Sequence, residues 1–180
     1  MSRGCLLAGG YFHIAIQHHP DDLRSVLAHE LTHDCVAFLP LPLWINEGLA
    51  QRVDRSVGLT AEPLIDFDLK ERHLAFWNET NIQQFWAGVS FSSVGDAQQL
   101  SYSLAEILLT LAEEQSGDHA SFLRNAHYDD AGQTAAFDHL GVDLADLAST
   151  FLGPGEWRPN RKAIADAWEQ WQTRVPNEAE

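Results

Sequence analysis

Residues 27–33 (LAHELTH) and 44–50 (WINEGLA) decide the fold of this chain. The first stretch lies in a run whose apolar residues recur at helical spacing, which predicts a helix from the Asp21-Asp22 pair to about Phe38. Two prolines follow and end this helix. The second stretch then begins another helix, which is predicted to end near Val53. The chain is therefore expected to turn back on itself as a pair of helices.

The first stretch places two histidines four residues apart in its helix. His29 and His33 are about 40° apart around the helix axis, so both imidazoles can bind one metal ion. Glu30 lies about 60° from His33, beside the metal but off the line of the ligands. A general base that takes a proton from metal-bound water must stand in that position. The spacing predicts a metal site with Glu30 as its catalytic base.

A catalytic zinc ion usually takes three protein ligands and keeps one position open. In the metzincin arrangement, Gly and His would stand at two positions where this sequence has Val36 and Leu39, so that arrangement fails. The other arrangement takes a glutamate from a second helix, and the turn at the prolines can present Glu47 towards the histidines. The predicted ligands are His29, His33 and Glu47, and the predicted metal is Zn²⁺, although these ligand types also suit other divalent metals.

HELTH followed by WINEGLA resembles the gluzincin metallopeptidases, most of all their short, helical peptidase-MA-like branch, and more distantly aminopeptidase N and thermolysin. In those families the two histidines and the later glutamate bind zinc, and the glutamate after the first histidine is the base. The resemblance implies the same roles for His29, His33, Glu47 and Glu30. It covers residues 10–54 most strongly.

The resemblance also implies a fold class. We expect a mainly α protein with α+β character, a gluzincin-like catalytic domain in which short N-terminal β-strands precede the metal-binding helix pair and a helical C-terminal part. Residues 11–17 (YFHIAIQ), rich in β-branched and aromatic residues, predict such a strand. In gluzincins an edge strand at this place pairs with the substrate peptide, but an ordinary sheet strand is equally consistent with the pattern.

Three further residues are candidates for supporting roles. Tyr102 opens a long predicted helix, and the resemblance implies that it stabilises the oxyanion in catalysis; a tyrosine at the edge of the core is the alternative. Asn46 is expected to cap the second helix rather than to contact substrate. Gln51 lies four residues after Glu47, where thermolysin-like proteins carry an acid, and is expected to hold a histidine N–H.

The rest of the chain is predicted to be helical. Short helices are expected over residues 66–86 and a loop over 91–96. A strong amphipathic helix is predicted from Leu100 to near Gly117, and a last helix over residues 161–172. Between these two helices, aspartates are expected to cap short helices: Asp118, Asp129 or Asp130, and Asp143.

Length and composition predict a single domain. The 180 residues suffice for one domain with a core, in which 1–58 carry the strand and the metal-site helices and 59–180 form the helical part. Eleven basic against 26 acidic residues give a net charge of −15, which repels phosphate backbones and anionic lipid. Nucleic acid and membrane surfaces are therefore not the expected partners. Without an apolar run of about 18 residues or a signal-peptide pattern, a cytoplasmic location is expected.

The sequence thus predicts a zinc metallopeptidase, a hydrolase that acts on a peptide or protein substrate. A protein-interaction domain that uses the same metal site as a scaffold, without proteolysis, is the second hypothesis. The two cysteines form no CxxC pair, so a sulfur-ligated zinc site is not predicted.

Overall fold

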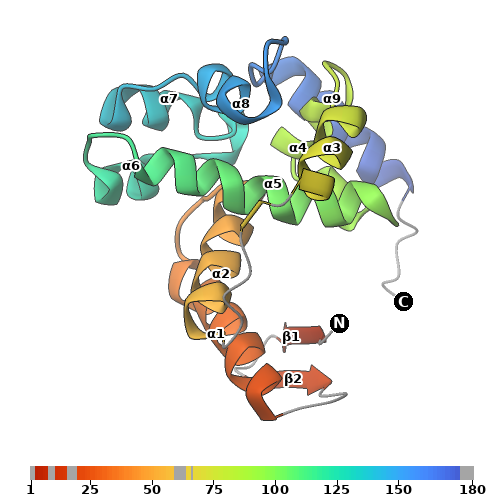
Figure 1. The fold of residues 1–180 in the computed structure, drawn as a ribbon, viewed down its shortest axis with the longest axis vertical. Helices are drawn as coiled ribbons and strands as arrows, with labels where there is room; N and C mark the ends of the chain where they lie inside the picture. The colour runs from red at the N-terminus through yellow and green to blue at the C-terminus, as the bar shows by residue number, and fades with distance from the viewer. Residues whose placement is uncertain (1–2, 8–10, 16–19, 59–63, 66, 175–180) are drawn as a thin grey trace.

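The structure, a computed structural model, describes residues 3–7, 11–15, 20–58, 64–65 and 67–174. These ranges are predominantly helical (Figure 1). In chain order the elements are β1 (Arg3–Leu7), β2 (Tyr11–Ala15), α1 (Pro20–Val36), α2 (Leu43–Val57), α3 (Phe67–Phe76), α4 (Asn81–Trp86), η1 (Val89–Ser92), α5 (Asp96–Glu113), α6 (His119–Asn125), η2 (Tyr128–Asp130), α7 (Gln133–Ala135), η3 (Ala136–Leu140), α8 (Leu144–Leu152) and α9 (Arg161–Arg174).

The α+β part of the predicted fold class is wrong, and the protein is mainly α. The predicted strand at 11–17 is present as β2 as far as Ala15, and residues 16–17 lie outside the described ranges. It pairs antiparallel with β1, from Arg3 opposite Ala15 to Leu7 opposite Tyr11, and these two make up the sheet of the described residues. Two five-residue strands cannot form a layer on which a domain packs. The core cluster comes instead from the helices and their connections.

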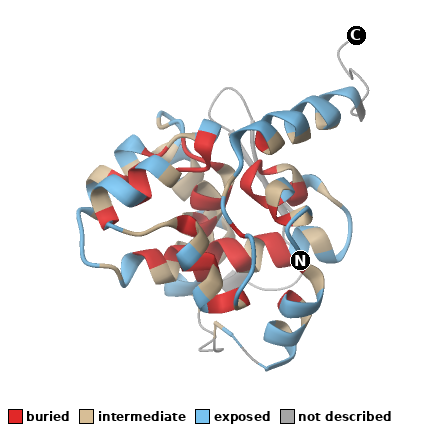
Figure 2. Ribbon diagram, turned by 90° about the horizontal axis from the view of Figure 1, so that it is seen from above, coloured by how far each residue is buried: buried red, intermediate tan, exposed pale blue. Residues whose placement is uncertain are grey.

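The core is built around α5. Nine of its 18 residues are buried, from Leu100 to Ala112, and the buried parts of the ribbon gather in the interior of the molecule (Figure 2). Aromatic side chains pack beside it, with Trp44 of α2 in edge contact with Trp86 of α4 at a ring distance of 5.8 Å. Trp77, Trp86 and Trp157 are also buried in this core. We call α3 to α9, with α5 at the centre, the helical body.

The helix α2 is held tightly against α5. A Cβ atom added to Gly48 would lie 2.8 Å from the Ala105 carbonyl oxygen, so only glycine allows this approach. Farther along the same contact, the Arg55 guanidinium donates to the Glu106 carboxylate at 3.0 Å. The helix α1 packs against α2, and in Figure 1 the two helices extend together from the helical body. Thus α2 packs directly on the helical body, and α1 is attached to the body through α2.

Two predicted helix starts are confirmed by their caps. The Asp118 carboxylate accepts from the backbone N–H of Ser121 at 2.9 Å, and Asp143 accepts from that of Ala145 at 2.8 Å. The predicted loop at 91–96 is wrong in part, because its first two residues belong to η1 and its last begins α5. No helix in the described ranges has the length and apolar character that crossing a lipid bilayer requires.

Candidate metal centre

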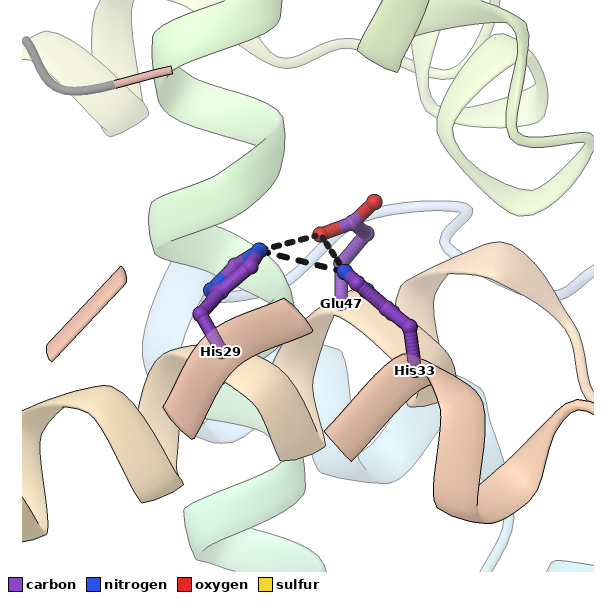
Figure 3. A group of neighbouring side chains, drawn as sticks. All are labelled: His29, His33 and Glu47. Atoms are coloured by element: carbon purple, nitrogen blue, oxygen red, sulfur yellow. Dashed lines mark hydrogen bonds and ion pairs between the residues drawn. The ribbon is translucent and has the colours of Figure 1, made fainter. Parts of the chain in front are cut away.

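The two helices α1 and α2 bring the three predicted ligands together. Figure 3 shows His29 and His33 pointing from α1 towards Glu47 of α2. The Nε2 atoms of His29 and His33 lie 3.1 Å apart. The Oε2 atom of Glu47 lies 3.6 Å from the first and 3.5 Å from the second. We call these three residues the ligand triad.

The spacing of the three atoms fits a metal ion. A triangle with edges of 3.1, 3.5 and 3.6 Å has a point about 2.0 Å from each corner. Zinc binds imidazole nitrogen and carboxylate oxygen at about 2.0–2.2 Å. The ligand triad of His29, His33 and Glu47 could therefore hold a metal ion.

The Glu47 carboxylate gives independent support for this reading. Its side chain is 12% exposed, and its Oε2 atom is buried without a hydrogen-bond partner in the described part of the chain. The 3.5 and 3.6 Å contacts with the histidine nitrogens are too long to be hydrogen bonds. A buried carboxylate oxygen left in this state is costly. A cation between the three atoms removes that cost.

The orientation of His33 is fixed by Asn46. Its Nδ1 lies 2.6 Å from the Asn46 Oδ1, and since an amide oxygen only accepts, Nδ1–H must be the donor. This bond selects the tautomer whose Nε2 lone pair faces the ligand triad. The prediction that Asn46 caps α2 is wrong, because Pro42 is the N-cap residue and no side-chain cap bond is made there. Likewise Asn46, rather than the expected Gln51, holds a histidine N–H.

The electrostatic field at His29 is negative. Burial opposes protonation of this imidazole, but the Glu47 carboxylate, followed by those of Glu30 and Asp54, outweighs burial and raises its pKa. A field that favours a proton on His29 also favours a metal cation at the same nitrogen. The sequence identified Glu47 and Glu30 as neighbours of this histidine but not Asp54.

The structure places Tyr102 beside the same group of charges. Burial, together with the carboxylates of Glu47 and Glu30, raises the pKa of Tyr102 to about 12. Its ring rests edge-on against Phe91 at a centroid distance of 5.3 Å. The phenol is therefore protonated at neutral pH and available as a hydrogen-bond donor.

One contact between α1 and α2 was missed in the sequence. The Ser25 hydroxyl donates to the Asp54 carboxylate across the helix pair. Ser25 lies four residues before His29, and Asp54 lies seven after Glu47, so each shares a helix face with a ligand. In the sequence, this helical spacing from the predicted ligands was the only indication that Ser25 and Asp54 could lie near the site. Thr32, by contrast, donates to the Ala28 carbonyl of its own helix at 2.7 Å.

Comparison with known proteins gives no relative. No protein family, no curated protein and no solved structure matches this chain significantly. Function must therefore be inferred from the site itself.

Proposed function

We propose that this chain is a zinc-dependent peptidase whose site resembles that of the gluzincins. The observation that carries the proposal is the ligand triad, three ligand atoms at metal-binding spacing of which one is an unsatisfied buried carboxylate oxygen. Two imidazoles and one carboxylate favour zinc over magnesium or calcium, which take mainly oxygen ligands.

The residues around the ligand triad support hydrolysis. Zinc, when bound, polarises a scissile carbonyl and lowers the pKa of water. Glu30, whose charge reaches both His29 and Tyr102, takes one proton from the attacking water and delivers it to the leaving amine nitrogen. The Tyr102 hydroxyl donates a hydrogen bond to the oxyanion that develops on the carbonyl. The products are an amine and a carboxylic acid, which ionises to a carboxylate by releasing its proton to solvent.

The substrate class is a peptide or protein. The net charge of −15 opposes the binding of nucleic acids, which are polyanions. Glu30 and Glu47 add negative charge at the site itself. A neutral or cationic polypeptide chain meets no such repulsion.

The test pairs metal content with activity. Purified protein is expected to carry one zinc per chain by elemental mass spectrometry, and His29→Ala or Glu47→Ala is expected to lose it. A chelator should stop cleavage of a peptide library, and added Zn²⁺ should restore it. Zinc-free wild-type protein, or cleavage that survives the chelator, would contradict the proposal.

One observation favours the second candidate, a zinc-bound interaction domain without proteolysis. A cleft of about 660 Å³ lies between α4 and the α9 region, and none of its lining residues belongs to the ligand triad. A protein partner could bind there while the metal serves only the helix pair. Zinc-loaded protein that cleaves no peptide in the library would favour this candidate.

A further inference from the structure

The helix α1 carries two metal ligands but has little apolar anchorage. Of its residues 23–36, none is buried. Leu23, Leu27 and Leu31 recur every four residues, and each is at least 36% exposed. Among the described α1 residues, Val36 in the last turn packs against the core cluster. Hydrophobic burial therefore contributes less to the position of this helix than to that of α5.

Polar bridges to α2 hold α1 instead. Near one end of the pair Ser25 donates to Asp54, and near the other His33 donates to Asn46. We call these the outer bridges. They are eight residues apart on each helix, a distance of about 12 Å along either axis. Equal spacing on two antiparallel helices allows both bridges to form in only one register. Of the ligand triad, His29 lies between the two bridges, and His33 belongs to the second bridge itself.

We propose that Ser25 and Asp54 are positioning residues for the metal centre, because their bridge holds α1 in the register that brings His29 opposite Glu47. This inference rests on the metal site of the proposed function. One consequence is that metal binding and the docking of α1 on α2 form a single coupled equilibrium. Metal stabilises the docked helix. The Ser25–Asp54 bridge raises metal affinity because it already supplies part of the free energy needed to dock α1 on α2.

The placement of the pair explains why this bridge acts on His29. Ser25 is one helical turn before His29 on the same face of α1. Asp54 is close enough to His29 for its charge to act on that imidazole. The His33 end already has its own bridge in Asn46. Without Ser25, the N-terminal half of α1 keeps the ligand His29 but loses its polar link to α2.

The experiment measures zinc affinity by competition with a chromophoric chelator. Ser25→Ala is expected to weaken zinc binding about tenfold, the usual scale for residues that orient metal ligands. Ser25→Thr keeps the hydroxyl and is expected to restore affinity to within about twofold. Ser56→Ala is the matched control, because that hydroxyl donates to the Val53 carbonyl within α2. It should leave affinity unchanged.

Hydrogen exchange supplies a readout that is independent of peptidase activity. Zinc is expected to slow exchange of the α1 amides in the wild type, with a smaller slowing in Ser25→Ala, while α5 exchange stays the same in both. Unchanged α5 exchange also establishes that the variant is folded. If Ser25→Ala does not fold, Asp54→Ala and Asp54→Asn replace it. The Asp54→Asn variant still has an oxygen that accepts from the Ser25 hydroxyl, so it should bind zinc more tightly than the Asp54→Ala variant.

The outcomes separate the two proposals. Wild-type protein that binds zinc, with Ser25→Ala binding it equally well, overturns the positioning role and leaves the metal site standing. Exchange in zinc-free α1 as slow as in α5 overturns the coupling. Wild-type protein that binds no zinc overturns the metal site itself and this inference with it.

Discussion

Helices α1 and α5 have similar lengths, 17 and 18 residues, but they are held in place by different forces. Half of α5 is buried, whereas no residue of α1 between 23 and 36 is buried. The position of α5 follows from hydrophobic packing, and that of α1 from polar bridges and the ligand triad. Stability of the helical body and assembly of the site should therefore be separable by mutation.

Two histidines, one in the helical body and one in the ligand triad, show the same difference between a packed core and a polar site. His73 is fully buried in the body, where its Nδ1 accepts from the Trp77 Nε1–H at 2.9 Å and its Nε2 lies 3.1 Å from the Ser103 hydroxyl. Burial, with a smaller effect of Arg72, lowers the pKa of His73 to about 4. Around His29, burial is outweighed by carboxylates and the pKa rises. One imidazole is kept neutral as a packing element, and the other faces a field that attracts cations.

The largest effect is expected from Glu30→Gln, which changes the site and leaves the body intact. The amide cannot accept a proton, so kcat should fall by about 10²–10⁴-fold. Zinc content and the urea midpoint should match those of the wild type. Steady-state kinetics on a cleaved peptide, with elemental analysis of the same sample, gives the measurement. Full activity in this variant would remove Glu30 from the mechanism.

The body should respond to pH through His73. The folded-state pKa of about 4 lies below the unfolded value of 6.5, so the unfolded chain binds the proton more readily. Stability from this residue is fully present above pH 6.5 and is lost as the pH falls towards 4, by up to about 3 kcal/mol.

A variant isolates this contribution from that of other titrating groups. The glutamine of His73→Gln is neutral at every pH. The free energy of unfolding of the wild type, minus that of His73→Gln, should therefore decrease as the pH falls from 6.5 to 4. Urea unfolding of both proteins with chelator present measures the difference. A difference that stays constant over this range would mean that His73 titrates normally in the folded protein.

A smaller loss of stability is expected from Gly48→Ala. The new Cβ would lie 2.8 Å from the Ala105 carbonyl oxygen and 3.2 Å from the Leu109 Cβ, so α2 and α5 must separate. Overpacking of this kind costs about 1–3 kcal/mol. Gly58→Ala is the matched control, since its nearest neighbour is 3.3 Å away at the end of α2. Equal urea midpoints for the two variants would contradict a close α2–α5 contact.

The sequence was informative where the signal is local. HELTH and WINEGLA located the helix pair and the atoms of the ligand triad, because i, i+4 spacing and a proline turn determine them almost alone. Helix caps at Asp118 and Asp143 are local in the same way. The expected α+β layer failed because a strand's pairing partners are set by tertiary structure, and β2 has only β1 among the described residues.

Contacts between the helices could not be predicted. The bridges from Ser25 to Asp54 and from His33 to Asn46 depend on the register of α1 against α2. Periodicity gives the face of a residue but not how far one helix has slid along another. For the same reason Asn46 and Gln51 could not be distinguished in the sequence as partners of a histidine.

The smallest effect is expected from variants that test whether Asn46 or Gln51 is the partner of the His33 N–H. Asn46→Ala removes the acceptor from His33 Nδ1–H, frees the ring to rotate, and should weaken zinc binding about tenfold. Asn46→Asp keeps an acceptor and should retain zinc affinity, while Gln51→Ala should leave it unchanged. Chelator competition measures all three variants, and unaltered urea midpoints would place the effect in the site rather than in the body. Weaker zinc binding in Gln51→Ala than in Asn46→Ala would mean that Gln51, one turn farther along α2, and not Asn46, orients the His33 imidazole.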